Sequence, residues 1–281
     1  MPDAPLRLVP AASVSLEEYA AAFTSAFSGY RIPVTLDAAA LAWRVRLEQY
    51  ALEESLVAYN GAELAGVAAL ALRGDRGWVA GLALVPAQRG RGRGRQLMAA
   101  LLERARDCGV RRLSLEVLRG NEAARRLYES VGMKVARDLL LLGRPGERVD
   151  EASAFKGSAS LQEAPPRELL EGFARLHAEP PAWQRDLPSL LVKGRLRGFH
   201  LGERAAPAAY ALLSYGRDGN THISDLAAAG ADEAASLCAA LARLPGTLKI
   251  INEPEHSLFT RPLLAHGFEE TDRQHEMAMT L

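Results

Sequence analysis

The chain has 281 residues, 48% hydrophobic and 24% charged, with 34 basic residues (Lys and Arg) balanced by 34 acidic ones (Asp and Glu). This is the composition of a globular protein long enough for one large domain or two ordinary ones. The zero net charge argues against a general nucleic-acid binder. There is no apolar stretch long enough to span a bilayer and no recognisable leader peptide, so we expect a cytoplasmic protein without membrane association.

The metal-binding and disulfide-forming residue types have no informative spacing. Cys108 and Cys238 stand far apart, and the six histidines are scattered through the second half of the chain. Structural disulfides and zinc sites require clustered cysteines or histidines. We therefore expect reduced thiols and no bound metal.

Two regular elements are predicted around the middle of the first half. Trp78–Val85 is a short apolar run bounded by Gly77 and Pro86, which is typical of a buried strand. Residues 96–108 repeat apolar side chains at helical spacing, and Gly109 follows where a helix C-cap is expected. The chain therefore passes from a strand to a helix across residues 86–95.

The connection between these elements contains the run QRGRGRGRQ, residues 88–96. Glycines let backbone amides approach a ligand closely, and a helix N-terminus adds a partial positive charge, so a phosphate-binding loop is predicted. A disordered nucleic-acid segment is the alternative, but such a segment would not be enclosed by two apolar elements. The run has neither the lysine of a P-loop nor the glycine spacing of a Rossmann loop.

A second strand and helix follow. Arg112–Val117 alternates as a strand does, and residues 121–133 read NEAARRLYESVGM, which is typical of an amphipathic helix. The strand ends close to where this helix begins.

Together these motifs resemble those of the GCN5-related N-acetyltransferase (GNAT) family. Arg89-x-x-Gly92-x-Gly94 is similar to that family's pyrophosphate loop, and LEVLRGNEAARRLYESVGM is similar to its second conserved block, with Met133 in place of the usual phenylalanine. The resemblance covers about Ser55 to Leu142 closely. It implies a mixed, mostly antiparallel sheet flanked by helices, and acetyl-CoA as cosubstrate.

The resemblance also assigns donor-binding roles. The backbone of Leu84 and Val85 is expected to bond the pantetheine arm where two strands part, and Asn121 to contact the same arm. The pyrophosphate is expected to meet the backbone amides of the loop residues Arg89, Gly90, Arg91, Gly92, Arg93, Gly94 and Arg95.

Two residues are predicted to carry the chemistry. Acyl transfer to an amine needs a base for the amine and a proton for the departing thiolate. The resemblance gives the proton-donor role to Tyr128 and the base role to Glu116, with Asp75 as a weaker alternative. Each residue also has a purely structural alternative. Tyr128 would then be a half-buried aromatic on an amphipathic helix, and Glu116 a strand carboxylate that faces solvent or an arginine.

The second half repeats the first. The stretch beginning at Leu248 aligns with the one beginning at Leu113, which predicts tandem domains of α/β (α+β) class, residues 1–148 and 149–281, joined near residues 144–160. The second copy has AAAGADEA, residues 227–234, where the arginine–glycine loop would stand. The alignment replaces Glu116, Asn121 and Tyr128 by Ile251, His256 and Leu263. We expect this half not to bind CoA.

These observations predict an acetyl-CoA-dependent N-acetyltransferase in which a primary amine attacks the thioester directly, with catalysis in residues 1–148. The alternatives are a non-catalytic acyl-CoA sensor and RNA binding through the arginines. The acceptor, a small molecule or a peptide amine, is not specified by the sequence. We expect no nucleic-acid partner, and a monomer or a homodimer.

Overall fold

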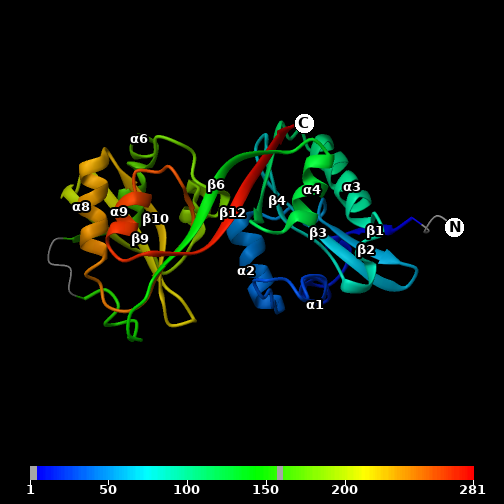
Figure 1. Cartoon of the computed structure of the whole chain (residues 1–281), viewed down its shortest axis with the longest axis horizontal. Coiled ribbons are helices and arrows are strands. Elements are labelled where there is room, and N and C mark those ends of the chain that lie inside the picture. The colour runs from blue at the N-terminus through cyan, green and yellow to red at the C-terminus, as the bar shows by residue number, and fades with distance from the viewer. Residues whose placement is uncertain (1–4, 157–160) are drawn as a thin grey trace. The chain divides into compact units, whose positions relative to one another are not determined.

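The computed structural model describes residues 5–156 and 161–281, which form two compact units (Figure 1). Unit 1 holds the residues up to Ala136 together with Glu276–Leu281, and unit 2 holds Arg137–His275. These units differ from the expected ranges 1–148 and 149–281. The strands β6 (Lys134–Arg144) and β12 (Glu269–Thr280) account for the difference, because each begins in one unit and ends in the other.

Unit 1 is a sheet with helices on both faces (Figure 1). Its strands stand in the order β1-β2-β3-β4-β5, followed by the C-terminal part of β12. The elements are β1 (Arg7–Pro10), the 3₁₀ turn η1 (Ala11–Ser13), α1 (Leu16–Ala26), α2 (Ala38–Glu48), β2 (Leu56–Asn60), β3 (Glu63–Arg73), β4 (Arg76–Leu84), the 3₁₀ turn η2 (Pro86–Gln88), α3 (Arg93–Asp107), β5 (Arg112–Leu118) and α4 (Glu122–Ser130).

The core of unit 1 forms where the apolar stripe of α3 packs on the sheet. Leu97, Met98 and Leu101 are fully buried against side chains of β2, β3 and β5. Met277 of β12 is buried in the same cluster, so the last residues of the chain complete this core. On the other face α1 packs on β3, and Phe23 closes over Gly81, where a Cβ would stand 3.0 Å from its ring.

Unit 2 repeats this order of elements. Its sheet runs from the N-terminal part of β12 through β6, β11, β10, β9 and β8 to β7. The elements are β7 (Gln162–Ala164), α5 (Pro166–Leu170), α6 (Phe173–Leu176), the 3₁₀ turn η3 (Trp183–Arg185), α7 (Leu187–Val192), β8 (Arg197–Glu203), β9 (Ala206–Tyr215), β10 (Thr221–Ala228), α8 (Ala231–Leu241), β11 (Leu248–Pro254) and α9 (Thr260–Ala265).

The structure confirms the predicted repeat in its strand pairing. In unit 1 β4 pairs in parallel with β5, Gly77 opposite Leu113, and in unit 2 β10 pairs in parallel with β11, Thr221 opposite Leu248. This is the alignment expected from the sequence. Each unit also has a β-bulge shortly after the last parallel pair, with Ala80 as the extra residue of β4 and Ser224 as the extra residue of β10.

The predicted elements are confirmed, with one shift. The helix expected over residues 96–108 begins at Arg93, because Gly92 takes a left-handed φ of 74° as its N-cap and lets the chain turn directly into the helix. Arg93, Gly94 and Arg95 therefore belong to the first helical turn and not to the loop. Gly109, with φ 73°, follows the helix as expected.

The residues that join the repeats are described up to Lys156 and again from Leu161, so part of the connection expected near residues 144–160 lies outside the described residues. Within the part of the chain that the structure covers, every helix is too short or too polar to cross a membrane.

Candidate functional site

A cavity of about 690 Å³ opens in unit 1 where β4 and β5 separate. The two strands pair in parallel only over Arg76–Trp78 and Arg112–Ser114, and the residues that follow on each strand are not paired with one another. Leu82–Leu84 of β4 line one wall of the cavity, and Leu118 at the end of β5 with residues 119–121 after it line the other. The strands diverge because β4 continues its pairing with β3 through a bulge while β5 leads into α4.

The arginine–glycine run forms one end of this cavity. Gly90, Gly92 and Gly94 all line it, and their amides have no hydrogen-bond acceptor among the described residues. Gly90 and Gly92 have φ of 75° and 74°, which side chains other than glycine rarely adopt. A Cβ at Gly94 would lie 3.3 Å from the side chain of Leu127, so glycine also allows α3 to approach α4. This end of the cavity suits an anion, because amides and a helix N-terminus meet there.

The four arginines of the run have different positions. Arg89 and Arg95 line the cavity, whereas Arg91 and Arg93 do not, and Arg93 is 3% exposed. The guanidinium of Arg89 donates to backbone carbonyls of its own unit. The sequence pattern showed a basic loop. It did not show that Arg89 and Arg95 line the cavity or that Arg93 is buried.

The predicted arm-binding residues are also divided. Leu84 and Asn121 line the cavity. Asn121 is the N-cap of α4, and its side chain accepts a hydrogen bond from the amide of Ala124 at 3.3 Å. Val85 lies outside the lining, and its amide donates to the carbonyl of Ala65 at 3.0 Å.

Tyr128 lines the cavity from α4. Its side chain is packed into the core of unit 1 with 6% of the residue exposed, and it still lines the cavity. Burial raises the pKa of Tyr128 far above the usual phenol value, and the nearby Tyr30 raises it further. The phenol is therefore protonated throughout the neutral range and can donate a proton.

Glu116 is on β5 but is not part of the cavity lining. Its neighbours Leu115 and Val117 point into the core beneath α3, so the alternation of the strand places Glu116 on the opposite face. There its Oε2 accepts a hydrogen bond from the indole Nε1 of Trp78 at 2.6 Å. Asp75, the weaker candidate base, is also outside the lining, and its carbonyl accepts the amides of Arg111 and Arg112.

The connection between α1 and α2 contributes a further wall; it lies within Ser13–Gln49, a stretch that sequence reasoning expects to help form the acceptor pocket without naming the residues that line it. Phe27, Tyr30 and Arg31 line the cavity from this segment, and Arg119 lines it from beyond β5. Arg31 reaches the carbonyl of Arg119 with a hydrogen bond of 3.3 Å. The spacing of Phe23, Phe27 and Tyr30, whose rings contact one another in series, was the available signal.

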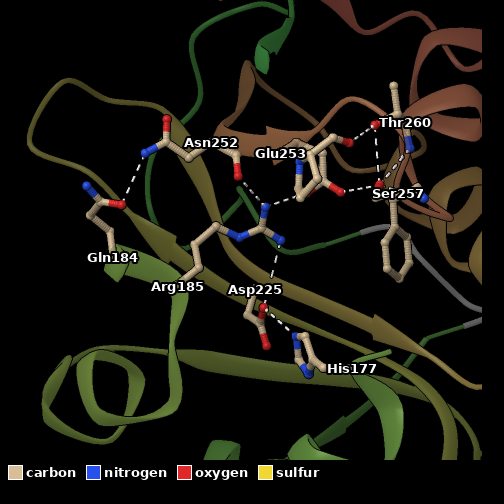
Figure 2. A network of polar contacts seen from close by, with 10 residues as sticks. His177, Gln184, Arg185, Asp225, Asn252, Glu253, Ser257 and Thr260 are labelled. Atoms are coloured by element: carbon tan, nitrogen blue, oxygen red, sulfur yellow. Dashed lines mark hydrogen bonds and ion pairs between the residues drawn. The ribbon is translucent and has the colours of Figure 1, made fainter. Parts of the chain in front are cut away.

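Unit 2 has a different arrangement at the corresponding place. Its β10 and β11 also part after Ile223 and Ile250, but Arg185 of η3 lies between them (Figure 2). The Arg185 guanidinium pairs with Glu253 of β11, and its Nη2 lies 3.8 Å from Asp225 of β10. All three side chains are buried, at 4% exposure or less.

Further polar contacts surround this buried group (Figure 2). The Nε2 of His177 is hydrogen-bonded to Oδ1 of Asp225 at 3.2 Å, and its Nδ1 is hydrogen-bonded to the carbonyl oxygen of Phe173 at 3.0 Å. Tyr210 donates to the other oxygen of Asp225 at 2.9 Å, and Ser257 donates to Glu253. The buried group therefore combines two acids, one arginine and a histidine that contacts an acceptor with each ring nitrogen.

The helix after β10 lacks the features of an anion site. Only residues 229 and 230 separate β10 from α8, compared with residues 85–92 between β4 and α3. Asp232 and Glu233 occupy the first turn of α8, where their charges repel an anion. The positions aligned with Glu116 and Tyr128 hold an exposed Ile251 and a buried Leu263.

Comparison with known proteins agrees with this geometry. Residues 17–133 match the Acetyltransferase (GNAT) family. A curated relative, an uncharacterized N-acetyltransferase, YycN, of Bacillus subtilis (strain 168), is 48% identical over 46 residues, which is 16% of this chain and 30% of the relative. The match therefore spans less than a third of that protein's length.

Two solved structures share the fold over nearly the whole chain. A GCN5-related N-acetyltransferase from Sphaerobacter thermophilus superposes with a TM-score of 0.71 at 14% identity, covering 98% of this chain and 95% of that one. A tandem GNAT protein from the clavulanic acid biosynthesis pathway gives a TM-score of 0.64 at 17% identity, covering 98% of both chains. The two units are thus a tandem GNAT fold.

Proposed function

We propose that this chain, whose residues 17–133 match the Acetyltransferase (GNAT) family, transfers the acetyl group of acetyl-CoA to a primary amine in unit 1. The observation that carries the proposal is the cavity between the parted strands β4 and β5, which ends at the glycine amides and the N-terminus of α3. It joins an apolar slot to an anion site in one continuous space.

The residues present fit acetyl-CoA. The amides of Gly90, Gly92 and Gly94 and the side chain of Arg95 would hold the pyrophosphate, since unpaired amides at a helix N-terminus stabilise an anion. The arm would lie along Leu82–Leu84, whose edge is left without a strand partner after Trp78. Acetyl-CoA supplies the thioester that the amine attacks.

Tyr128 is the proton donor in this proposal. Because burial raises its pKa, the phenol keeps its proton at neutral pH and can give it to the sulfur as the C–S bond breaks. It lines the cavity while being almost fully buried, which supports the role.

Glu116 is the proposed base. The hydrogen bond from Trp78 fixes one oxygen of the Glu116 carboxylate. The carboxylate lies on the sheet face that α1 covers through its contacts with β3 and β4. Since the carboxylate stands outside the lining, it would take the amine proton through water, and the neutral amine would then attack the thioester carbonyl. Direct attack needs no cysteine relay, and neither Cys108, exposed beyond α3, nor Cys238, buried in unit 2, lines the cavity.

Unit 2 is proposed not to bind acetyl-CoA. The side chain of Arg185 stands between β10 and β11, where the arm would have to pass, and a short turn followed by two acids in the first turn of α8 replaces the glycine loop. One donor molecule per chain is the consequence. The acceptor remains a small-molecule or peptide amine that enters unit 1.

Calorimetric titration of acetyl-CoA into the protein tests the donor site directly. We expect one molecule bound per chain in wild type and strongly reduced binding after Gly92→Ala, because a Cβ at φ 74° distorts the loop. Two molecules per chain would contradict the assignment of unit 2, and no binding would refute the proposal.

A screen of primary amines for CoA release, run with Tyr128→Phe as control, then tests catalysis. Turnover that depends on Tyr128 supports the enzyme. Tight binding of acetyl-CoA with no turnover on any amine would favour an acyl-CoA sensor instead.

A further inference from the structure

The side chain of Arg89 makes three hydrogen bonds, and all of them end on backbone carbonyls of unit 1. Its Nε donates to Leu84 at 2.9 Å, and its Nη2 donates to Ala26 at 3.1 Å and to Ser28 at 2.7 Å. Leu84 ends β4, whereas Ala26 and Ser28 end α1 and begin the connection to α2. One guanidinium therefore joins two segments about 60 residues apart in sequence.

Only arginine carries this set of donors in a fixed plane. The guanidinium presents five N–H groups in a rigid fork, whereas a lysine ammonium is a point charge on a flexible stem. Gly29, which follows the acceptor Ser28, has a φ of 75°, a backbone conformation that side chains other than glycine rarely adopt. Three of the N–H groups of this fork are engaged by backbone carbonyls of unit 1, although Arg89 also lines the cavity.

The segment held by Arg89 forms the cavity wall that faces Tyr128. Phe27, Gly29, Tyr30 and Arg31 all line the cavity. The amide of Tyr30 donates to the Phe27 carbonyl at 3.0 Å, and the two rings stand edge to face with centroids 5.5 Å apart. Tyr30 is also close enough to Tyr128 to influence its titration.

We propose that Arg89 is a positioning residue that holds residues 27–31 as the acceptor-side wall of the site and does not bind the donor phosphates with its side chain. This inference rests on the proposed function of unit 1. It links the loop that would hold the donor to the wall that an acceptor amine would meet, because Arg89 is part of the loop sequence and bonds to the wall. Loss of the side chain would loosen the wall while leaving the glycine amides in place.

Three variants separate positioning from phosphate binding. Arg89→Gln removes the fork, Arg89→Lys keeps the charge but not the fork, and Arg95→Gln removes the other arginine of the run that lines the cavity. Hydrogen–deuterium exchange reports on residues 27–31, and titration with acetyl-CoA reports on the donor site. Circular dichroism and thermal unfolding confirm that each variant is folded.

For Arg89→Gln and Arg89→Lys we expect exchange in residues 27–31 to rise about tenfold, because these amides lose local protection, while acetyl-CoA affinity changes less than about threefold. For Arg95→Gln we expect the reverse, with affinity falling about tenfold on loss of a charged phosphate contact. With the best amine from the screen, both Arg89 variants should raise the amine KM more than the acetyl-CoA KM.

The proposal is overturned if the Arg89→Lys variant keeps the wild-type hydrogen–deuterium exchange of residues 27–31 and the wild-type amine KM, since the positive charge alone would then suffice. It is also overturned if Arg89→Gln weakens acetyl-CoA binding as much as Arg95→Gln does. Failure of the proposed function is a separate outcome, because it appears as absent acetyl-CoA binding in wild type, and exchange in residues 27–31 can still be measured there.

Discussion

Trp78 and Glu116 form a hydrogen bond from indole Nε1 to carboxylate Oε2 at 2.6 Å, and Glu116 lies two residues beyond Ser114, the partner of Trp78 in the last parallel pair of β4 and β5. The bond stands at the point where the two strands begin to part. Trp78 is itself buried at 4% exposure, with its ring tilted against that of Tyr50, so the donor is held rigidly. The proposed base is thus fixed by a residue of the neighbouring strand.

This contact leads to a first prediction. Glu116→Gln is expected to lower kcat/KM for the amine by about 100-fold or more, since a positioned base contributes about 10²–10⁴-fold. Trp78→Phe keeps the carboxylate but removes its fixed partner, so its loss should be smaller, about tenfold. Steady-state kinetics on both variants provides the measurement, and equal, wild-type rates would exclude Glu116 as the base.

Tyr128→Phe removes the proton donor and keeps the ring that packs under α3. We expect kcat to fall by about 10²-fold or more, with acetyl-CoA affinity and thermal stability close to wild type. Because the pKa of Tyr128 is raised by burial, its deprotonation should not limit the wild-type rate at any pH up to about 10, the usual phenol value. An alkaline loss of activity below that pH that disappears in the variant would contradict this.

The glycines of the loop should respond differently to alanine. Gly92→Ala places a side chain at φ 74°, so we expect weaker acetyl-CoA binding and a destabilisation of about 1 kcal/mol or more. Gly94→Ala is the matched control, because this residue has helical backbone and its Cβ would meet only the ends of two side chains, Leu127 at 3.3 Å and Leu84 at 3.9 Å. Titration calorimetry and chemical unfolding compare the two, and equal effects would argue against a special role for the left-handed turn.

The buried ion network of unit 2 should be costly to break. Arg185→Met leaves Asp225 and Glu253 buried without their cation, and we expect a loss of about 3–5 kcal/mol in unfolding free energy. The combination Arg185→Met with Glu253→Gln removes a charge of each sign and should recover part of that loss. Urea denaturation measures both, and a neutral single variant would show that the contacts do not stabilise the unit.

His177 predicts a pH dependence of stability. Burial opposes its charged form, but the hydrogen bond and charge of Asp225 outweigh burial and raise the pKa of His177, with Arg185 opposing and Tyr210 bonded to the same carboxylate. A raised folded-state pKa stabilises the protein below the unfolded value of about 6.5, and that stabilisation disappears as pH rises through the folded value.

Urea denaturation between pH 6 and pH 9 should therefore show wild-type stability falling with rising pH in this window. His177→Gln is expected to have a flatter profile and a lower stability at pH 6. A wild-type stability that rises over the same range would contradict the assignment.

Much of the site could be predicted from local sequence. The strand before the loop, the helix after it and the cap at Asn121 follow from apolar spacing and from residues with strong local preferences. The tandem architecture followed from the repeat between Leu113 and Leu248. The parallel pairing of β5 with β4 and that of β11 with β10 reproduce this repeat. These features depend on neighbours in sequence or on a repeated pattern.

Contacts between distant segments could not be predicted in this way. The attachment of Arg89 to Ala26 and Ser28 depends on where α1 ends in space, and no pattern within residues 88–96 encodes it. The limits of the units depend likewise on β6 and β12, which are each divided between the two units. Their place in the sheet, between β5 and β11, depends on contacts with strands that are distant in sequence. The fold determines which carbonyl oxygens accept hydrogen bonds from an arginine such as Arg89, because the charge pattern of the sequence is compatible with many acceptors.

The sequence by itself determined the element order, the glycine loop, the repeat and the loss of loop and catalytic residue types in the second copy, because these are properties of composition and spacing. Only the tertiary structure decided that Arg185 fills the gap between β10 and β11, that Glu116 is held by Trp78, and that residues 27–31 form a wall of the cavity. The physical reason is that burial and hydrogen bonding join residues far apart in the chain, and their energies depend on the packed geometry.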